Sequence, residues 1–162
     1  MDTEKAEGPI EGQFDYDEYK NEYDKDFVDH WDDLINWEGR AEGERGFFER
    51  LLGAHGVRTV LDCACGTGYH AVSLAKSGFT VTATDGAQTM VDKTVENANQ
   101  HDIALADTRM VDWCNLHREF GENAFGALVC LGNAFTHIFD HETRRDALTS
   151  MYKVLKPGGI AV

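Results

Sequence analysis

The sequence predicts an α/β fold in which helices cover both faces of a parallel sheet, and three observations lead to this prediction. From about residue 57 onward, short apolar segments alternate with segments of helical periodicity. The first apolar segment runs into a glycine turn, GTG at residues 66–68. The last helical segment ends in LKPGG at residues 155–159, which is followed by another apolar segment. Such alternation implies right-handed crossovers between parallel strands.

The N-terminal third of the chain differs from this pattern. Residues 1–22 form an acidic arm that we expect to be partly disordered, because residues 1–12 mix charges with glycine and proline. Residues 23–57 contain two predicted helices. The first shows an apolar face at Phe27, Trp31, Leu34 and Ile35, and the second spans residues 41–54. Residues 58–162 then form the predicted core domain.

The core elements follow in order from hydrophobic pattern and turn residues. They are a strand at 59–63, a helix at 69–76, a strand at 79–84, a helix at 88–99, a weaker strand at 102–106, a strand at 124–131, a helix at 142–155 and a strand from residue 160. The helix at 88–99 aligns Val91, Val95 and Ala98, and the helix at 142–155 aligns Leu148, Met151, Tyr152 and Leu155.

The chain stops three residues into this fifth strand, which would leave one flank of the sheet open. We therefore expect a sheet truncated after the start of the fifth strand. A shortened chain, a proteolytic fragment, or a homo-oligomer or other partner that completes the sheet edge would each account for it.

Composition limits the classes of partner. The 162 residues suit one domain, and 29 acidic against 15 basic residues give a net charge of −14, with 17 of the acidic residues in residues 1–57. Repulsion of phosphates makes nucleic acid and anionic membranes poor partners. No apolar run reaches the ~20 residues of a membrane span, and a signal-peptide pattern is missing at the N-terminus. We expect a cytoplasmic protein, and the acidic excess suggests adaptation to a salty cytoplasm.

The cysteines and histidines do not form a recognisable metal motif. Four cysteines are too few and too unevenly spaced for a disulfide scaffold, so we expect reduced thiols. The seven histidines lack HExxH spacing, and only the pairs Cys63/Cys65 and Cys114/His117 come near ligand spacing. We expect no metal site.

The glycine turn and an acidic residue after the second strand predict a nucleotide-type cofactor. Gly66 and Gly68 permit a tight turn and a close ligand approach. Asp85 follows 17 residues after Gly68, where a carboxylate accepts hydrogen bonds from a ribose diol; alternatively, it caps the next helix. With Ala71, the glycines also match the GxGxxA pattern of dinucleotide enzymes. The glycines alone do not separate a dehydrogenase from a methyltransferase.

Three further features favour a methyltransferase. Asp62 lies at the strand end, where a carboxylate opposes a pyrophosphate but can orient a cationic amino acid moiety. Two helices precede the first strand, whereas a dinucleotide fold usually begins with the strand. The fourth strand leads into GNAFTH at residues 132–137, a polar loop at the expected point of strand-order reversal.

On these motifs the sequence resembles the class I S-adenosylmethionine-dependent methyltransferases, and within them the glycine and glycine/sarcosine N-methyltransferases. VLDCACGTG (60–68) and LKPGG (155–159) are general to the class. GFTVTATDGAQTM (78–90), ALVCLGNAFTHI (127–138), Trp31 and Arg40 also carry the resemblance, and CLGNAFTH with Trp31 and Arg40 is the narrower part. The resemblance covers roughly residues 23–162 and implies a Rossmann-like sheet.

The resemblance also implies site residues. Arg40 would pair with the methionine carboxylate, Asp85 would hold the ribose, and Asp112 and Trp113 would hold the adenine. The remaining cofactor contacts implied are Tyr23, Trp31, Ala64, Gly66, Gly68 and Leu131. Asn133 would contact substrate, and Asn133 and His137 are the candidates for a catalytic role. Taken singly, Trp31 and Trp113 fit core anchors as well, and His137 an ordinary hydrogen-bonded histidine.

The implied activity is methyl transfer from S-adenosylmethionine to glycine or sarcosine, leaving S-adenosylhomocysteine. The acceptor comes from the resemblance alone, because the family's substrate-carboxylate arginine lies beyond the last strand of this chain. The chain by itself is therefore expected to be inactive. Leu34 and Ile35 stand where some relatives place an entrance tyrosine, and Trp37 could compensate. Another class I small-molecule methyltransferase, or a non-catalytic nucleotide-binding or dinucleotide-binding module, remains the alternative.

Overall fold

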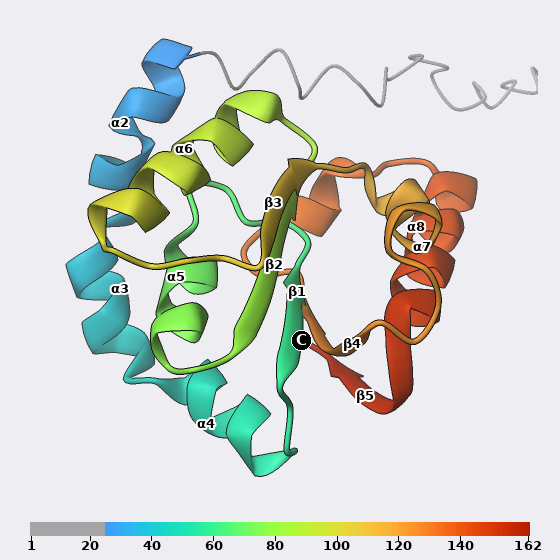
Figure 1. Cartoon of the computed structure of the whole chain (residues 1–162). Helices are drawn as coiled ribbons and strands as arrows, with labels where there is room; N and C mark the ends of the chain where they lie inside the picture. Colours follow the sequence, from blue (N-terminus) through green and yellow to red (C-terminus); the bar gives the residue numbers. More distant parts are fainter. Residues whose placement is uncertain (1–24) are drawn as a thin grey trace, which may run out of the picture.

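The computed structural model describes residues 25–162, so the acidic arm and Tyr23 lie outside the described residues. Five parallel strands form one sheet in the order β3-β2-β1-β4-β5 (Figure 1). Their bounds are β1 Thr59–Asp62, β2 Thr80–Asp85, β3 Asp107–Met110, β4 Phe125–Val129 and β5 Leu155–Ala161. This arrangement confirms the predicted α/β fold with a parallel sheet.

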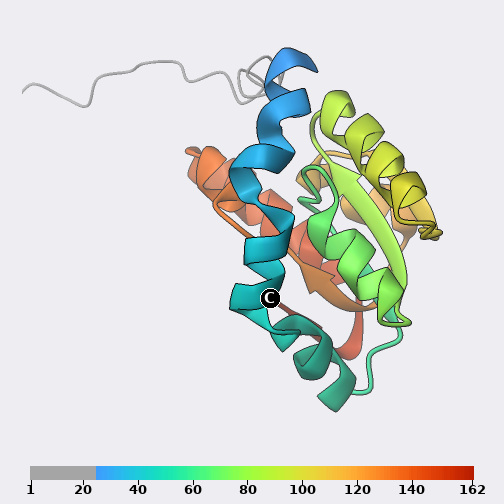
Figure 2. The same ribbon diagram turned by 90° about the vertical axis from the view of Figure 1, so that its left-hand side faces the viewer.

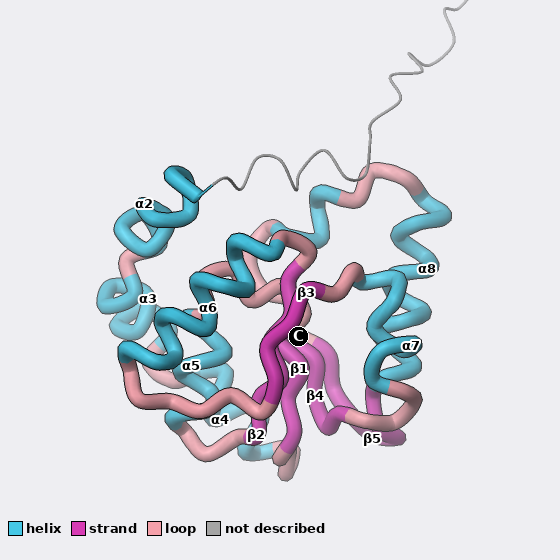
Figure 3. The backbone as a smooth tube through the Cα atoms, turned by 45° about the horizontal axis from the view of Figure 1, so that its top comes forward, coloured by secondary structure: helices cyan, strands magenta, loops and turns pink. Residues whose placement is uncertain are grey.

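Helices cover the sheet on both sides, as Figure 3 shows. On one side lie α5 (Tyr69–Lys76) and α6 (Gln88–Gln100), and on the other lie α7 (Leu116–Phe120) and α8 (His141–Val154). Two short 3₁₀ helices, η1 (Trp113–Asn115) and η2 (Ala134–His137), follow β3 and β4. From β1 the chain crosses on one face of the sheet to β2, and from β4 it crosses on the opposite face to β5. The strand order therefore reverses between the neighbouring strands β1 and β4.

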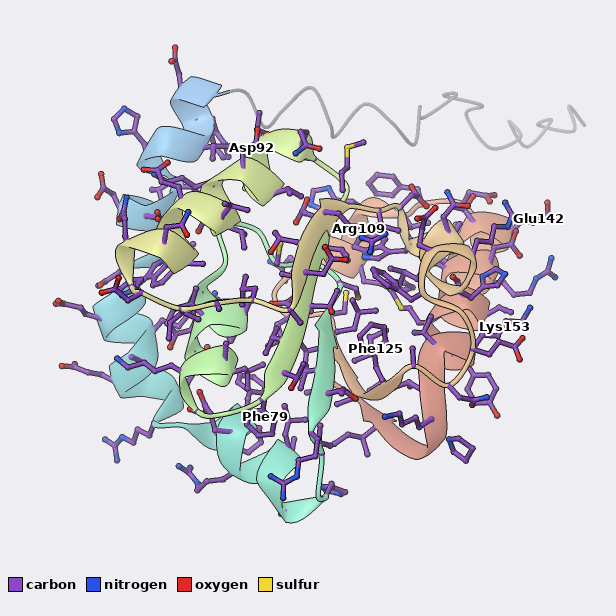
Figure 4. All side chains as sticks on the ribbon, in the orientation of Figure 1. Phe79, Asp92, Arg109, Phe125, Glu142 and Lys153 are labelled. Carbon is purple, nitrogen blue, oxygen red and sulfur yellow. The ribbon has the colours of Figure 1, made fainter. Side chains whose placement is uncertain are left out.

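The core consists of two layers separated by the sheet, because successive side chains of a strand point to opposite faces. Val60 of β1 belongs to the cluster under α4 and α5, and Leu61 belongs to the cluster under α7 and α8; both are fully buried. Phe125, labelled in Figure 4, lies between the sheet and the second layer, where its ring packs against Phe120 with centroids 5.4 Å apart.

Three helices, not two, precede β1 within the described residues. They are α2 (Lys25–Ile35), α3 (Trp37–Glu44) and α4 (Phe47–Ala54), and Figure 2 shows them following one another down one side of the molecule. The single helix predicted at 41–54 is wrong because the chain breaks at Arg45 and Gly46. Both residues adopt left-handed backbone angles, with φ of 48° and 68°.

The apolar face predicted for the first helix is rotated in the structure. Val28 is 3% exposed and packs with Trp31, Ala87 and Met90, whereas Leu34 is 69% exposed. The helix turns the partly buried Asp32 inward instead, because that carboxylate accepts hydrogen bonds from three other residues. The hydrogen bonds of Asp32 thus determine which face of α2 turns inward more than the apolar periodicity does.

Three other sequence predictions are corrected. The weak strand predicted at 102–106 is β3 at Asp107–Met110; the left-handed backbone at Asp102 (φ 54°) extends the preceding turn. On α6, Val91 and Ala98 are buried but Val95 is exposed. On α8, Met151 is buried with Ala147 and Val154, whereas Leu148 and Tyr152 are exposed.

The LKPGG segment forms part of β5 and does not merely precede it. Leu155 pairs with Phe125, and Ile160 pairs with Ala127, so the segment accommodates a register shift along the edge of β4. Gly158 supplies a positive φ of 77° within it. Among the helices formed by residues 25–162, none combines the length and hydrophobicity needed to cross a membrane.

Candidate functional site

A cavity of about 330 Å³ opens at the carboxyl ends of β1, β2 and β4, next to the reversal of strand order. In open α/β sheets this is the usual place for a ligand, and the volume falls within the range of small-molecule sites. Helices α2 and α3 contribute the outer wall. The lining residues are Trp31, Ile35, Arg40, Cys63, Ala64, Cys65, Gly66, Thr67, Tyr69, His70, Asp85, Gly86, Met90, Trp113, Leu131, Gly132, Asn133, Ala134 and His137.

The glycine turn after β1 is fixed by α6 as well as by its own backbone. Gly66 and Gly68 have φ of 54° and 96°, which only glycine adopts readily. Thr94 of α6 donates its hydroxyl to the carbonyl oxygen of Gly66 at 2.8 Å. A Cβ on Gly68 would lie 2.9 Å from Thr94 Cγ2. Gly68 therefore serves helix packing and does not line the cavity.

Asp85 ties the end of β2 to this turn. One carboxylate oxygen accepts from the N–H of Gly66 and the other from the N–H of Ala87, each at 3.0 Å. Burial raises the pKa of Asp85, and these backbone hydrogen bonds act in the opposite direction. The alternative role as helix cap is not observed, because Ala87 is the N-cap of α6. A carboxylate has about four acceptor positions, so Asp85 keeps capacity for a ligand hydroxyl.

Asp62 is a buried carboxylate with an unused acceptor. It is 2% exposed at the end of β1, and Oδ2 has no hydrogen-bond partner among the described residues. Burial raises its pKa from 3.8 to about 7; the long hydrogen bond from Ala64 N–H lowers it and the charge of Asp85 raises it further. Such an atom favours a donor or a positive charge nearby.

Arg40 and His70 meet at a shared carboxylate on the α3 side of the cavity. Arg40 Nε lies 3.5 Å from Glu44 Oε1, and His70 Nε2 lies 3.1 Å from the same oxygen. The guanidinium also lies over the ring of Tyr69, 5.6 Å from its centroid. Burial lowers the pKa of His70 although Glu44 opposes the shift. Because a guanidinium has five N–H donors, Arg40 can hold Glu44 and a second anion together.

Two indoles flank the cavity from different elements. Trp113, the first residue of η1, donates its Nε1 hydrogen to the carbonyl oxygen of Cys63, and its ring lies 5.9 Å from that of Phe135. Trp31 of α2 packs against Phe27 and approaches the turn, with its Nε1 within 3.9 Å of a Cβ built on Gly66. Both rings thus have structural contacts and also face the cavity.

The structure brings most of the predicted site residues together and leaves two of the described ones outside the cavity lining. Around the cavity lie Trp31, Arg40, Ala64, Gly66, Asp85, Trp113, Leu131, Asn133 and His137. Tyr23 is outside the described residues, and Gly68 and Asp112 do not line the cavity. Asp112 instead caps η1, with its Oδ1 accepting from Cys114 N–H at 2.9 Å. Trp37 does not line the cavity, and its ring stacks on that of His101 with the centroids 5.2 Å apart.

The residues that sequence reasoning missed are mainly those of α5 and α6. Tyr69 and His70 line the cavity, and Thr94 and Asn97 support the turn from behind. The sequence could have indicated Tyr69 and His70, because both directly follow the GTG motif at the start of a helix. Thr94 and Asn97 gave no comparable signal, because polar residues on a helix usually face solvent.

The cysteines are free thiols in this fold. Burial raises the pKa of Cys63 and Cys65 well above the ordinary thiol value, which disfavours a thiolate beside the cavity. Within residues 25–162, His, Cys, Asp and Glu side chains do not gather in a group of three or more suited to a metal ion.

A family described as a methyltransferase domain matches residues 60–159. A glycine/sarcosine N-methyltransferase from Parasynechococcus marenigrum is 47% identical over 146 residues, covering 90% of this chain and 51% of the relative. One from Aphanothece halophytica is 45% identical and covers 97% of this chain and 58% of the relative. The chain thus spans little more than half the length of these curated relatives.

Solved structures agree on the fold. A S-adenosylmethionine-dependent methyltransferase from Clostridium acetobutylicum superposes with a TM-score of 0.68 at 20% identity. The match covers 84% of this chain and 55% of that chain. At this identity the likeness concerns the arrangement of sheet and helices.

Proposed function

The chain belongs to the methyltransferase domain family, and we propose that it is the S-adenosylmethionine-binding part of an N-methyltransferase acting on glycine or sarcosine. One observation carries the proposal. A single cavity is lined by an arginine, an aspartate and two indoles, and Asp62, whose buried Oδ2 has no partner among the described residues, directly precedes Cys63 of that lining. That set matches the charges of a nucleoside that carries an amino acid: an anionic carboxylate, a cationic amine, a ribose diol and a flat base.

Each part of such a ligand has a partner of matching chemistry. Arg40 would hold the carboxylate, and Asp85 at the end of β2 would accept from the ribose hydroxyls. The unused oxygen of Asp62 suits the positive amino acid end. Trp113 would cover the base, with Asp112 next to it at the end of β3. Tyr23, Trp31 and Leu131 would complete the enclosure in this proposal, and the backbone at Ala64 and Gly66 leaves room for close approach.

S-adenosylmethionine supplies a methyl group on a positively charged sulfur, which an amine displaces directly. The chain's contribution is then to hold both reactants in line and to exclude water. Asn133 and His137, on the loop after β4, lie where they could contact an acceptor amine. Elsewhere in the cavity lining, the raised pKa values of the Cys63 and Cys65 thiols and the lowered pKa of His70 disfavour the charged forms of these side chains.

The substrate proposal rests on the two relatives, which are glycine/sarcosine N-methyltransferases. Methylation of these small amino acids would yield sarcosine and dimethylglycine, early intermediates toward the osmolyte betaine. The net charge of −14 is consistent with a salt-stressed cytoplasm as the place of action. A small amino acid is thus the proposed substrate. Among the described residues, β5 forms one edge of the sheet.

An acceptor panel tests the activity. The 162-residue chain, and separately a chain extended to the length of the two relatives, would be incubated with methyl-labelled S-adenosylmethionine and glycine, sarcosine, dimethylglycine or alanine. We expect label in sarcosine and dimethylglycine from the longer chain, and none from the 162-residue chain. Label transferred only to other acceptors by the longer chain would contradict the substrate proposal while leaving the cofactor proposal intact.

A further inference from the structure

A polar cluster behind the cavity joins three segments that are distant in sequence. Its members are Asp32 and Trp37 of the N-terminal helices, Thr67 of the glycine turn and Asn97 of α6. Thr67 is 1% exposed and Asn97 is 5% exposed. Hydrogen bonds between buried groups are specific in geometry, and an unmatched group there is costly.

Asp32 is the acceptor at the centre of this cluster. Its Oδ1 accepts from Trp37 Nε1 at 3.0 Å and from the hydroxyl of Thr67, and its Oδ2 accepts from Asn97 Nδ2 at 2.8 Å. Asn97 Nδ2 also donates to the carbonyl oxygen of Thr67 at 2.9 Å. Both oxygens of Asp32 are therefore engaged, and two of the three donors lie outside the N-terminal helices.

These bonds connect the outer wall of the cavity to its floor. Trp31, the residue before Asp32, lines the cavity from α2, and Thr67 lines it from the glycine turn. Among the described residues, the buried apolar cluster that joins α2 to the core comprises Val28 and Trp31 against Ala87 and Met90. Leu34, the large apolar residue next along α2, is exposed. Asp32 thus supplies much of the specific attachment of this helix.

We propose that Asp32 is a positioning residue that latches α2 and Trp31 onto the glycine turn and thereby slows release of the ligand beneath them. The statement about ligand release rests on the proposed function; the statement about the latch does not. With the latch intact, the ring of Trp31 stays over the turn. With it broken, α2 opens locally while the sheet stays folded.

Asp32→Asn is the informative substitution, and Asp33→Asn is its matched control. In Asp32 one carboxylate oxygen accepts from Trp37 and Thr67 and the other from Asn97, and an asparagine keeps an acceptor oxygen at only one of these two positions. The NH₂ group of the asparagine would then face either the hydroxyl of Thr67 or the Nδ2 group of Asn97, each of which is a donor in the unmodified chain. Asp33 lies one residue away and its side chain is 88% exposed, so its substitution removes the same charge without touching the cluster.

Backbone hydrogen exchange tests the latch without any ligand. We expect Asp32→Asn to accelerate exchange of the α2 amides about tenfold or more relative to Asp33→Asn, with the β1 amides unchanged. Equal exchange in α2 for the two variants would overturn the latch. This comparison holds even if the unmodified chain fails to bind S-adenosylmethionine, a result that would count against the proposed function alone.

Binding kinetics then test ligand retention. We expect Asp32→Asn to raise the Kd of S-adenosylhomocysteine about tenfold through a faster off-rate, with the on-rate nearly unchanged. Kinetics identical to those of Asp33→Asn would overturn this part. If Asp32→Asn accelerates exchange throughout the sheet, Thr67→Val decides, since it removes only the hydroxyl. Acceleration confined to α2 supports the latch, and acceleration equal in β1, or none in α2, overturns it.

Discussion

At the scale of single residues, Asp62 has the most consequential environment, because a buried carboxylate with an unpartnered oxygen penalises its own charge. Burial raises the pKa of Asp62 from 3.8, the value expected in the unfolded chain, to about 7 in the fold. A carboxyl of this kind stabilises the fold below the unfolded pKa, where it is protonated in both states. That contribution is lost as the pH rises through about 7.

Asp62→Asn should therefore change how stability depends on pH. We expect the free energy of unfolding of Asp62→Asn, relative to the unmodified chain, to rise by about 2–3 kcal/mol between pH 5 and pH 8, because asparagine cannot ionise. Urea unfolding at both pH values measures the difference, with Asp33→Asn as the exposed control. A relative stability that stays constant across this range would show that the fold does not raise the pKa of Asp62.

Alanine substitutions at two glycines with similar φ can distinguish the cost of backbone strain from the cost of a steric clash. Gly68 and Gly78 have φ of 96° and 93°, but only Gly68 faces a neighbour, Thr94. We expect Gly78→Ala to cost about 1 kcal/mol from the left-handed backbone. Gly68→Ala should cost about 2–4 kcal/mol, because its Cβ would also displace α6. Equal losses in denaturant titrations of the two variants would contradict the clash with Thr94.

At the scale of elements, α8 shows where hydrophobic periodicity misleads. The sequence places Met151 and Tyr152 on one face, yet Met151 is 6% exposed and Tyr152 is 79% exposed. We expect Met151→Ala to cost about 2–4 kcal/mol, whereas Tyr152→Ala should change stability by less than about 0.5 kcal/mol. Thermal and urea unfolding compare the two adjacent positions directly. A loss for Tyr152→Ala as large as that for Met151→Ala would favour the face predicted from sequence.

Elements whose signals are local were predicted well. Helix α5 occupies the predicted residues 69–76, because Gly68 fixes its start and Gly78 follows its end. The central strands β1 and β4 were found because they are short, largely apolar segments buried on both faces, and β2 (TVTATD) was found because it is rich in β-branched residues. β3 was displaced because its residues, DTRM, are half-buried at an edge and carry little hydrophobic pattern.

The site was predictable to the extent that it follows the strand ends. Gly66, Asp85 and the loop after β4 converge because parallel strands end at one edge of the sheet. Asp32 was not foreseen, since its role depends on Thr67 and Asn97, which are 35 and 65 residues away. No local pattern encodes such a pairing, and Asp32 beside Asp33 reads as a solvated face.

At the scale of the whole molecule, the excess of acidic residues is the dominant electrostatic feature. A net charge of −14 on 162 residues raises the free energy of the compact state through self-repulsion. Salt screens the repulsion between exposed charges that are farther apart than the Debye length, which falls from about 10 Å at 0.1 M to about 3 Å at 1 M. We expect the Tm of the chain to rise by several degrees between about 0.1 and 1 M KCl. A monotonic fall in Tm over this range would argue against adaptation to salt.

The proposed binding of S-adenosylmethionine in the cavity is tested most directly by calorimetric titration. S-adenosylmethionine, S-adenosylhomocysteine and NAD would be titrated into the same preparation, with Asp85→Asn as a variant that weakens the proposed ribose contact. We expect the two sulfur nucleosides to bind, Asp85→Asn to bind them about tenfold or more weakly, and NAD to give no heat of binding. Binding of NAD alone would contradict the account.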